Sequence, residues 1–353
     1  MTVLVTGHAG YIGTVLVPIL GGAGHTVRGL DSGLFEGCLF EAVGRPAPLA
    51  QRLDIRDVLP AAFDGVDAVV HLANLSNDPL GNLDPALTLG INHVATVRLA
   101  RLAREAGVRR FVFASSCSLY GRAGEGLVDE TAAFRPVTPY GRAKGLAERD
   151  LAQLASDAFS PVFLRNATVY GVSPRLRFDL VVNNLTAWAV STGAVRMTSD
   201  GRAWRPLVHV EDVGRAVLAA LEAPREAVHD QAFNVGATEE NYRVRDVARI
   251  VEEEVPGCVA SFADEAAPDT RSYRVSFSKI ADRLGWGPQR TVRDGVRELR
   301  EALQPRDLPP EVFEGPRFSR IAHLRARLAD GSLGPDLRWR AGAAALEPLS
   351  VAA

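Results

Sequence analysis

The chain has 353 residues and a formal net charge of −2, with 47% hydrophobic and 23% charged residues. These proportions are ordinary for globular proteins, and the charge gives no electrostatic basis for binding nucleic acid or an anionic membrane surface. No apolar run approaches the roughly 20 residues of a membrane-spanning helix. The length predicts either two domains or one large α/β unit.

The start of the sequence and its cysteines both favour a reducing compartment. Residues 3–5 already read as a strand, without the basic leader or cleavage pattern of a signal peptide. Cys38, Cys117 and Cys258 are scattered, and they have neither the pattern of a disulfide framework nor the spacing of metal ligands. We therefore expect a cytoplasmic protein without a metal site.

The first segments of the chain predict a site for a dinucleotide. Residues 2–6 are a short β-branched apolar run typical of a buried parallel strand, and a turn with three glycines follows. Glycine permits a sharp turn from strand to helix, where the backbone approaches a pyrophosphate at the helix N-terminus. A tight connection without a ligand is the alternative. The residues of this turn are Gly7, Gly10, Tyr11, Ile12 and Gly13.

Asp31 decides which dinucleotide the sequence favours. It ends a second strand-like segment, residues 26–30, where a carboxylate fits the acid that hydrogen-bonds an adenosine ribose 2′-OH. It would repel a 2′-phosphate, and no arginine follows within the next several residues, so NAD is favoured over NADP. A capping role for Asp31 is the alternative. Asp54 and Ile55, at the end of a weaker third strand, are candidates for the adenine side.

Alternating strands and helices predict the fold class. Strand-like segments at 67–73, 110–114 and 161–165 alternate with helical ones, which is typical of a doubly wound parallel sheet of the Rossmann type. Ligands of such sheets bind beyond the carboxyl ends of the strands, where Leu72, Ala73, Ser115 and Ser116 are expected.

Two polar residues in these segments have structural interpretations. His71, at the end of a strand, is interpreted as a structural histidine with satisfied hydrogen bonds. Asn92 lies inside a helix predicted for residues 85–106. A buried asparagine must find partners, so Asn92 either ties that helix to the neighbouring strand or is exposed.

The stretch around Tyr140 carries the candidate catalytic chemistry. The sequence has two lysines, Lys144 and Lys279, so a lysine four residues after a tyrosine stands out. Pro139 suits the first turn of a helix, on which Tyr140 and Lys144 share one face. An ammonium beside a phenol lowers the phenol pKa, which predicts a general acid/base for an alcohol. A surface helix with an incidental tyrosine and lysine is the alternative.

After about residue 172 the alternation breaks, which predicts a second region. We expect an NAD-binding domain at residues 1–172, to which residues 205–235 return. A smaller mixed α/β substrate-binding domain and a tail are expected at 173–204 and 236–353. The tail contains a basic helix-like segment, residues 317–325, interpreted as docked or interfacial rather than solvated.

The segments described so far resemble the extended short-chain dehydrogenase/reductase superfamily, in its nucleotide-sugar epimerase/dehydratase branch. The resemblance runs from residue 1 to about residue 303, and the tail after Gln304 has no counterpart. Each motif is weak or moderate alone, whereas their order and spacing together are specific. The motifs are Thr6-Gly7-x-x-Gly10-x-x-Gly13, Asp31, His71-Leu72-Ala73, Ser115-Ser116-x-x-x-Tyr120-Gly121, Tyr140-Gly-Arg-Ala-Lys144, Asn183-Asn184-Leu185 and Arg205-Pro-Leu-Val-His209-Val-Glu-Asp212.

The resemblance implies a catalytic triad of Ser116, Tyr140 and Lys144. Tyr140 exchanges a proton with a sugar hydroxyl and Ser116 holds that oxygen, while Lys144 lowers the tyrosine pKa and binds the nicotinamide ribose. It also implies NAD as cofactor, a nucleotide-diphosphate sugar as substrate, and a homodimer formed through helices 85–106 and 139–157. The expected cofactor-binding residues are Gly7, Gly10, Tyr11, Ile12, Gly13, Asp31, Asp54, Ile55, Leu72, Ala73, Ser115, Tyr140 and Lys144.

The substrate side is implied by the same resemblance. Arginine suits a diphosphate because its planar fork makes paired charge-assisted hydrogen bonds. Asn184, Arg205 and Arg271 are expected to contact the diphosphate, although Arg271 is equally interpreted as an ordinary surface residue. The expected substrate-binding residues are Ser76, Ser116, Cys117, Ser118, Thr168, Asn184, Leu185, Arg205 and Arg271.

Some positions depart from the patterns of particular relatives. Cys117 and Ser118 stand where 4,6-dehydratases carry the Asp-Glu pair that eliminates water, and they cannot offer that pair at neutral pH. A cysteine acts as acid/base only with a lowered pKa, and we interpret Cys117 as buried and inert. Thr168 stands where galactose-type 4-epimerases have an asparagine, and Ser76 and Asp78 lie near the expected sugar site. The sugar is therefore not expected to be an ordinary hexose match.

The sequence favours an NAD-dependent nucleotide-sugar epimerase, most simply at C4, acting through a transient 4-keto sugar with Tyr140 as acid/base. A nucleotide-sugar 4-ketoreductase, decarboxylase or dehydratase with the same triad is the alternative within enzymes. A non-catalytic dinucleotide-sensing or scaffold protein is the alternative from another class. The nucleotide, the sugar and the carbon that reacts are left open.

Overall fold

A parallel β-sheet of seven strands organises the molecule. The computed structural model describes residues 1–40, 49–197, 199–262 and 271–340. The strand order is β11-β7-β5-β4-β1-β2-β3, and every neighbouring pair runs parallel. This order confirms the predicted Rossmann-type doubly wound sheet. Its strands are β1 (Thr2–Thr6), β2 (Thr26–Asp31), β3 (Leu49–Arg52), β4 (Ala68–His71), β5 (Arg110–Ser116), β7 (Ser160–Asn166) and β11 (Gln231–Val235).

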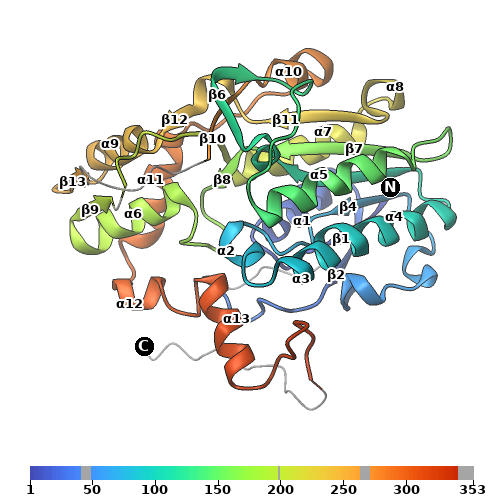
Figure 1. Cartoon of the computed structure of the whole chain (residues 1–353), viewed down its shortest axis with the longest axis horizontal. Helices are drawn as coiled ribbons and strands as arrows, with labels where there is room; N and C mark the ends of the chain where they lie inside the picture. Colours follow the sequence, from blue (N-terminus) through green and yellow to red (C-terminus); the bar gives the residue numbers. More distant parts are fainter. Residues whose placement is uncertain (41–48, 198, 263–270, 341–353) are drawn as a thin grey trace.

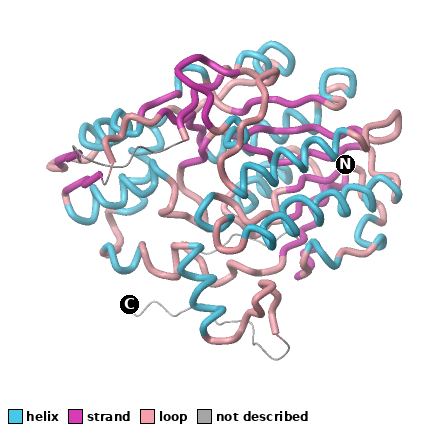
Figure 2. Tube along the Cα trace, in the orientation of Figure 1, coloured by secondary structure: helices cyan, strands magenta, loops and turns pink. Residues whose placement is uncertain are grey.

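Helices cover both faces of this sheet, as the apolar strands require (Figures 1 and 2). Side chains alternate along β1, so that Val3 and Val5 pack with the first helix layer whereas Leu4 packs with the second. The first layer consists of α1 (Gly13–Gly22) and α7 (Val210–Glu222). The second consists of α3 (Pro85–Leu89), a π-helical turn (Gly90–Ala95), α4 (Thr96–Glu105) and α5 (Pro139–Ala152).

A third core lies beyond the carboxyl ends of the sheet, where helices pack on one another. Its helices are α6 (Val181–Thr192), α9 (Val244–Glu254) and α11 (Val292–Leu303). Three small sheets accompany it: β8 (Thr168–Tyr170) with β10 (Trp204–His209) and β12 (Asn241–Arg243), β9 (Ala194–Met197) with β13 (Val259–Phe262), and β6 (Arg122–Val128) with β14 (Ser272–Val275). The remaining short helices are α2 (Asp78–Gly81), α8 (Arg225–Val228) and α10 (Ser278–Leu284).

The segment expected to return to the first domain is divided between two sheets. β11 adds to the edge of the large sheet beside β7, and α7 packs on that sheet. β10 instead pairs with β8 outside the large sheet. The assignment of domain boundaries stays a prediction.

The last described part of the chain folds back onto the rest of the molecule. The C-terminal segment, defined here as residues 304–340, contains α12 (Pro310–Phe313), α13 (Arg320–Ala329) and a bridge between Leu333 and Trp339. Leu324, Leu333 and Leu337 join the core of the second helix layer. The expectation that the basic helix is docked is therefore confirmed, and Figure 1 shows α13 running close to α2.

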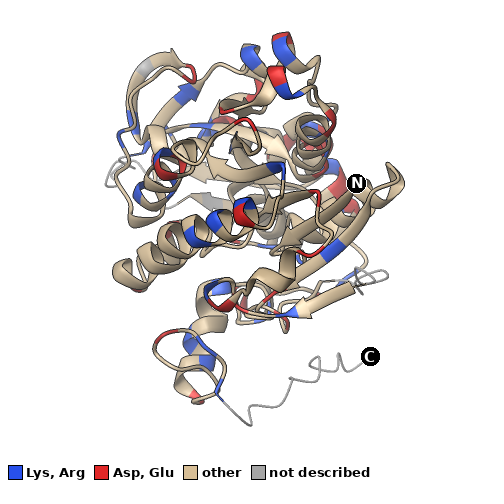
Figure 3. Cartoon of the chain, turned by 90° about the vertical axis from the view of Figure 1, so that its right-hand side faces the viewer, with Lys and Arg blue, Asp and Glu red and all other residues tan. Residues whose placement is uncertain are grey.

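Charged side chains are distributed without a dominant sign. Figure 3 shows acidic and basic residues interspersed over the helices of the viewed side. Among the described residues, no helix is both long enough and apolar enough to cross a membrane, and no cluster of histidine, cysteine and carboxylate side chains has the make-up of a metal site.

Candidate active site

A cavity of about 560 Å³ lies where the strands of the large sheet end. Its walls include the residues that follow β1, β2, β4, β5 and β7 at their carboxyl ends, which is where ligands of open parallel sheets bind. The predicted site residues that line it are Gly7, Gly10, Tyr11, Ile12, Gly13, Asp31, Asp54, Ile55, Leu72, Ala73, Ser76, Ser115, Ser116, Ser118, Tyr140, Lys144, Thr168, Arg205 and Arg271. Cys117, Asn184 and Leu185 are not among the residues that line the cavity.

The glycine turn is packed too tightly for side chains. A Cβ atom on Gly13 would lie 2.3 Å from the carbonyl oxygen of Gly7. Gly7 has a φ of 74°, and a Cβ there would lie 2.7 Å from the backbone nitrogen of Ala73. The turn therefore brings bare backbone to the edge of the cavity at the start of α1, the arrangement that suits an anionic group.

Asp31 holds this turn and also borders the cavity. Its carboxylate accepts hydrogen bonds from the backbone nitrogens of Ala9 at 3.3 Å and Gly33 at 2.9 Å. Asp54, in contrast, is bound by Arg56 through the arginine backbone nitrogen and the Nε and Nη2 atoms of its side chain. Both carboxylates line the cavity, but that of Asp54 is already engaged by a cation.

The loop after β4 is fixed by two buried polar residues. His71 bonds Thr6 through Nδ1 at 2.6 Å and Thr96 through Nε2 at 2.8 Å, which confirms its structural interpretation. Burial lowers the pKa of His71 to about 3, so this imidazole is neutral at pH 7. Asn92 accepts a bond from the backbone nitrogen of Leu75 and donates one to its carbonyl, at 2.8 and 3.0 Å.

Asn92 also explains why the predicted helix over residues 85–106 is not a continuous α-helix. It lies in the π-helical turn between α3 and α4, a distortion that proteins use at functional sites. The turn allows the buried Asn92 side chain to bond both backbone groups of Leu75. The loop that carries Leu75 and Ser76 is thereby held at the cavity wall.

Tyr140 and Lys144 meet at the first turn of α5. Thr138 caps this helix by accepting a hydrogen bond from the backbone nitrogen of Gly141 at 3.2 Å, and Pro139 follows in the first turn, as predicted. Ser116, at the end of β5, lies close enough to the Tyr140 hydroxyl for its side chain to favour the phenolate. Lys144 is 2% exposed, and its Nζ donates to the carbonyl of Ala114 and lies 5.7 Å from the centre of the Tyr140 ring.

The electrostatics of this pair differ from the prediction. Burial raises the pKa of Tyr140 to about 12, and the charge of Asp78 adds to this effect, against the effect of Ser116 and the charge of Arg177. Burial also lowers the pKa of Lys144 to about 7, although Glu148 opposes that shift. The prediction that Lys144 pulls the tyrosine pKa toward neutrality was therefore wrong for this structure. Desolvation is the largest cause of the shift, and the charges that act on the phenol are those of Asp78 and Arg177.

The residues on either side of Ser116, Ser115 and Cys117, make structural contacts. Ser115 borders the cavity, but its hydroxyl donates to Glu148, which forms a buried ion pair with Arg165 at 2.8 Å. Cys117 is 1% exposed, packs in the core of the first helix layer and points its Sγ at the carbonyl of Arg165. Burial raises the pKa of this thiol, in agreement with the interpretation of an inert cysteine.

The asparagine pair on α6 is turned away from the cavity. Asn184 donates to the carbonyl of Phe178 at 2.8 Å, and Leu185 packs into the third core. The neighbouring Asn183 instead donates to the Tyr11 hydroxyl and accepts a bond from the backbone nitrogen of Gly171. The predicted contacts of Asn184 and Leu185 with a substrate thus receive no support from their positions.

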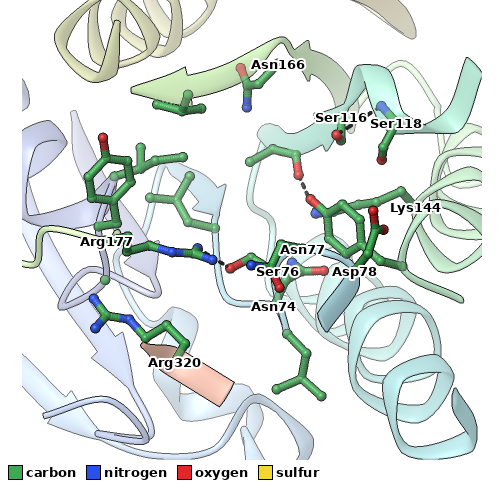
Figure 4. A pocket seen from close by; sticks show the side chains of 18 of the residues that line it. Asn74, Ser76, Asn77, Asp78, Ser116, Ser118, Lys144, Asn166, Arg177 and Arg320 are labelled. Carbon is green, nitrogen blue, oxygen red and sulfur yellow. Dashed lines mark hydrogen bonds between the residues drawn. The ribbon is translucent and has the colours of Figure 1, made fainter. Parts of the chain in front are cut away.

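The opposite wall carries Arg177 and Asp179, which sequence reasoning did not assign to the site. Arg177 bonds Asp179 through two nitrogens and donates to Ser76 at 2.7 Å (Figure 4). Arg271, which was expected at the substrate, pairs with Asp78. The signal for Arg177 and Asp179 was an acid and a base two residues apart in the loop that follows β8, at the end of a strand beside the cavity.

Unpartnered polar atoms show that the cavity suits a polar ligand. Five side chains that line it each have a buried atom without a hydrogen-bond partner in the described part of the chain. Buried polar groups are normally paired, so a ligand with donors and acceptors would complete these contacts. The atoms are Oδ1 of Asn74, Oδ1 of Asp78, Oγ of Ser118, Oδ1 of Asn166 and Nη1 of Arg320. Together with the glycine turn and Asp31, this donor and acceptor set fits a dinucleotide and a second polar molecule.

Comparison with known proteins agrees with this geometry. Residues 3–236 match the NAD dependent epimerase/dehydratase family. The chain belongs to this family. Its cofactor is NAD, and the fold is that of the family's solved structures. The structure of MoeE5 in complex with UDP-glucuronic acid and NAD is 28% identical, with a TM-score of 0.75, and the match covers 86% of this chain and 99% of MoeE5.

Family relatives with similar sequences carry out more than one reaction. A UDP-glucose 4-epimerase of Mycolicibacterium smegmatis is 32% identical over 321 residues, covering 85% of this chain and 98% of the relative. The UDP-glucuronic acid decarboxylase 1 of Arabidopsis thaliana is 27% identical over 323 residues, covering 89% of this chain and 72% of the relative. The chain is therefore an enzyme of the nucleotide-sugar epimerase/dehydratase type.

Proposed function

We propose that this enzyme is an NAD-dependent nucleotide-sugar epimerase that inverts the C4 hydroxyl of a UDP-sugar through a transient 4-keto sugar. The observation that carries the proposal is the meeting of Ser116, Tyr140 and Lys144 in one cavity that also contains the dinucleotide turn. The UDP assignment follows the relatives, and Arg205 and Arg271 at the cavity wall offer the guanidinium groups that suit a diphosphate.

Tyr140 is the proton-transfer group in this proposal. Its hydroxyl and that of Ser116 border the same cavity, so a sugar hydroxyl that takes a place beside both oxygens can pass its proton to a phenolate and recover it later. The chemistry that bound NAD would supply is to take a hydride from the sugar carbon and later return it, so that NAD is not consumed. Because the pKa of Tyr140 is raised to about 12, the phenol must lose its proton before it acts as a base.

Lys144, in its neutral amine form, is suited to accept that proton and become the ammonium. Its pKa is lowered to about 7 by burial, so a negative charge on the nearby phenolate would favour the ammonium form. The lysine then stabilises the phenolate only while the reaction proceeds. In this way the pair would perform the acid/base role even though the resting tyrosine is not acidic.

Elimination of water has weaker support at this site. The position after Ser116 holds Cys117, whose thiol faces the core and has a raised pKa, and the next is the neutral Ser118. Asp78 does line the cavity and keeps a buried Oδ1 without a described partner, but Arg271 holds the same carboxylate as an ion pair.

Deuterium labelling tests the proposal directly. The NAD-loaded enzyme is incubated with UDP-glucose, UDP-galactose and UDP-glucuronic acid, each carrying deuterium at C4, and the products are analysed by NMR and mass spectrometry. We expect the C4 epimer with unchanged mass and the label retained at C4, because the hydride returns to the carbon it left. Loss of carbon dioxide or water, or uptake of solvent hydrogen at C5, would contradict C4 epimerisation and indicate a decarboxylase or dehydratase.

A further inference from the structure

The C-terminal segment builds one wall of the cavity. Arg320, from the start of α13, and Leu337, from the bridge that follows it, both line the cavity. Trp339 donates from Nε1 to the carbonyl of Ser32 at 2.9 Å, directly after Asp31. Residues from the last part of the described chain are thus fixed against the loop where the adenosine ribose is expected.

Arg320 is buried, and one nitrogen of its guanidinium group has no described hydrogen-bond partner. It is 3% exposed, its Nη2 donates to the carbonyl of Arg175 at 2.8 Å, and its guanidinium lies 5.4 Å from the centre of the Phe35 ring. Its Nη1 has no hydrogen-bond partner among the described residues. Figure 4 shows Arg320 with Arg177 on the side of the cavity away from Lys144.

Other cations of the cavity have partners within the protein. Arg177 is held by Asp179 and Ser76, Arg56 by Asp54, and Lys144 by the carbonyl of Ala114. A buried guanidinium with an open N–H is costly unless a further acceptor reaches it. An acceptor of opposite charge would also offset the cost of burying the arginine.

We propose that Arg320 donates to the diphosphate of bound NAD, so that the C-terminal segment forms part of the cofactor site. The contacts of Arg320 and Trp339 with the loop after β2, Phe35 and Ser32, place this wall on the side of Asp31. Arg205 and Arg271, in contrast, lie on the side of Asp78, because Arg205 donates to the carbonyl of Arg271 and Arg271 pairs with Asp78. A guanidinium binds diphosphate oxygens through a rigid fork of donors. The proposal concerns the cofactor, so it holds whichever sugar reaction the enzyme performs.

The test compares Arg320→Gln with Arg325→Gln, which removes an exposed arginine of the same helix. NAD content after prolonged dialysis is measured by chromatography, and affinities for NAD, ADP and adenosine are measured by calorimetry. We expect Arg320→Gln to weaken NAD and ADP about 10- to 100-fold, because a charge-assisted bond is lost. Adenosine, which has no phosphate, and UDP added to the NAD-loaded enzyme should bind within about twofold of wild type.

The outcomes separate the two sources of a diphosphate. Weaker UDP binding with unchanged NAD would overturn the proposal and assign Arg320 to the substrate. Unchanged affinity for NAD, or an equal loss for adenosine and ADP, would also overturn it. Arg320→Lys keeps the charge and serves if Arg320→Gln does not fold: an intermediate loss for NAD supports the proposal, and wild-type affinity contradicts it. Arg325→Gln should leave all four ligands unaffected.

Discussion

Each of two walls of the cavity contains a buried cationic side chain, but the two side chains have different surroundings. On the catalytic wall, Lys144 lies at 2% exposure with its ammonium bonded to a backbone carbonyl and a lowered pKa. On the C-terminal wall, Arg320 is equally buried, and one guanidinium nitrogen is left without a described partner. A lysine can respond to burial by releasing its proton, whereas an arginine stays charged. The first wall is therefore suited to moving protons and the second to holding an anion.

The largest effect is expected when the phenol hydroxyl of Tyr140, on the catalytic wall, is removed. Tyr140→Phe removes the proton-transfer group and should lower kcat at least about 100-fold, in line with the contribution of general acid/base groups. Bound NAD should be retained. Steady-state kinetics and cofactor content measure both effects, and Tyr242→Phe, on β12 and outside the cavity lining, is the control. Turnover close to that of wild type would exclude Tyr140 as the acid/base.

A smaller effect should appear when Lys144 is replaced. Its folded pKa of about 7 lies below the ordinary value of 10.5, so between these values the unfolded chain binds more protons than the folded one. Stability therefore rises with pH across this window and is lost as pH falls toward 7, by up to about 1.4 kcal/mol per pH unit. Lys144→Met should make the free energy of unfolding, measured with urea, depend less on pH between pH 7 and 9.

The other lysine of the chain supplies the control for that measurement. Burial also lowers the pKa of Lys279, but this side chain is only partly buried, so Lys279→Met should flatten the profile less. The same flattening in both variants would mean that the burial of Lys144 is not the origin of the pH dependence.

The smallest effect is expected on the C-terminal wall. Trp339→Phe removes the hydrogen bond to the carbonyl of Ser32 and should lower the free energy of unfolding by about 1 kcal/mol. Arg52→Met, which removes the guanidinium over the Trp339 ring, should cost less because that contact is exposed. Denaturant unfolding measures both. Stability unchanged by Trp339→Phe would contradict the docking of the C-terminal bridge on Ser32.

The sequence predicted the catalytic wall better than the C-terminal one because local patterns specify it. The glycine turn, Asp31 and Tyr140 each lie directly after a strand or at a helix start, so alternation and capping place them at one edge of the sheet. Arg320 and Leu337 reach the cavity by long-range docking, which no local period encodes. Arg177 lies in the loop between β8 and α6, whose path depends on Asp179, Asn183 and Ser76.

Two details of the site depend on the assembled fold rather than on local sequence. Asn183 and Asn184 are adjacent on a helix, where one residue corresponds to a turn of about 100°, and tertiary packing leaves neither of them in the cavity lining. The acidity of Tyr140 depends on how much solvent the fold removes around it. Sequence spacing gives the proximity of a lysine, but the desolvation that raises the phenol pKa is a property of the assembled cavity.

The position of Arg320 and Leu337 near the end of the chain has a consequence for biosynthesis. The large sheet is complete once β11, ending at Val235, has left the ribosome, and N-terminal parts generally fold first. The cavity gains its last wall only when α13 and the bridge to Trp339 follow. A nascent chain stopped before α13 would present the glycine turn and Tyr140 in a cleft with one side missing. If Arg320 holds the cofactor, NAD would be bound fully only after the segment with Arg320 and Leu337 has been synthesised.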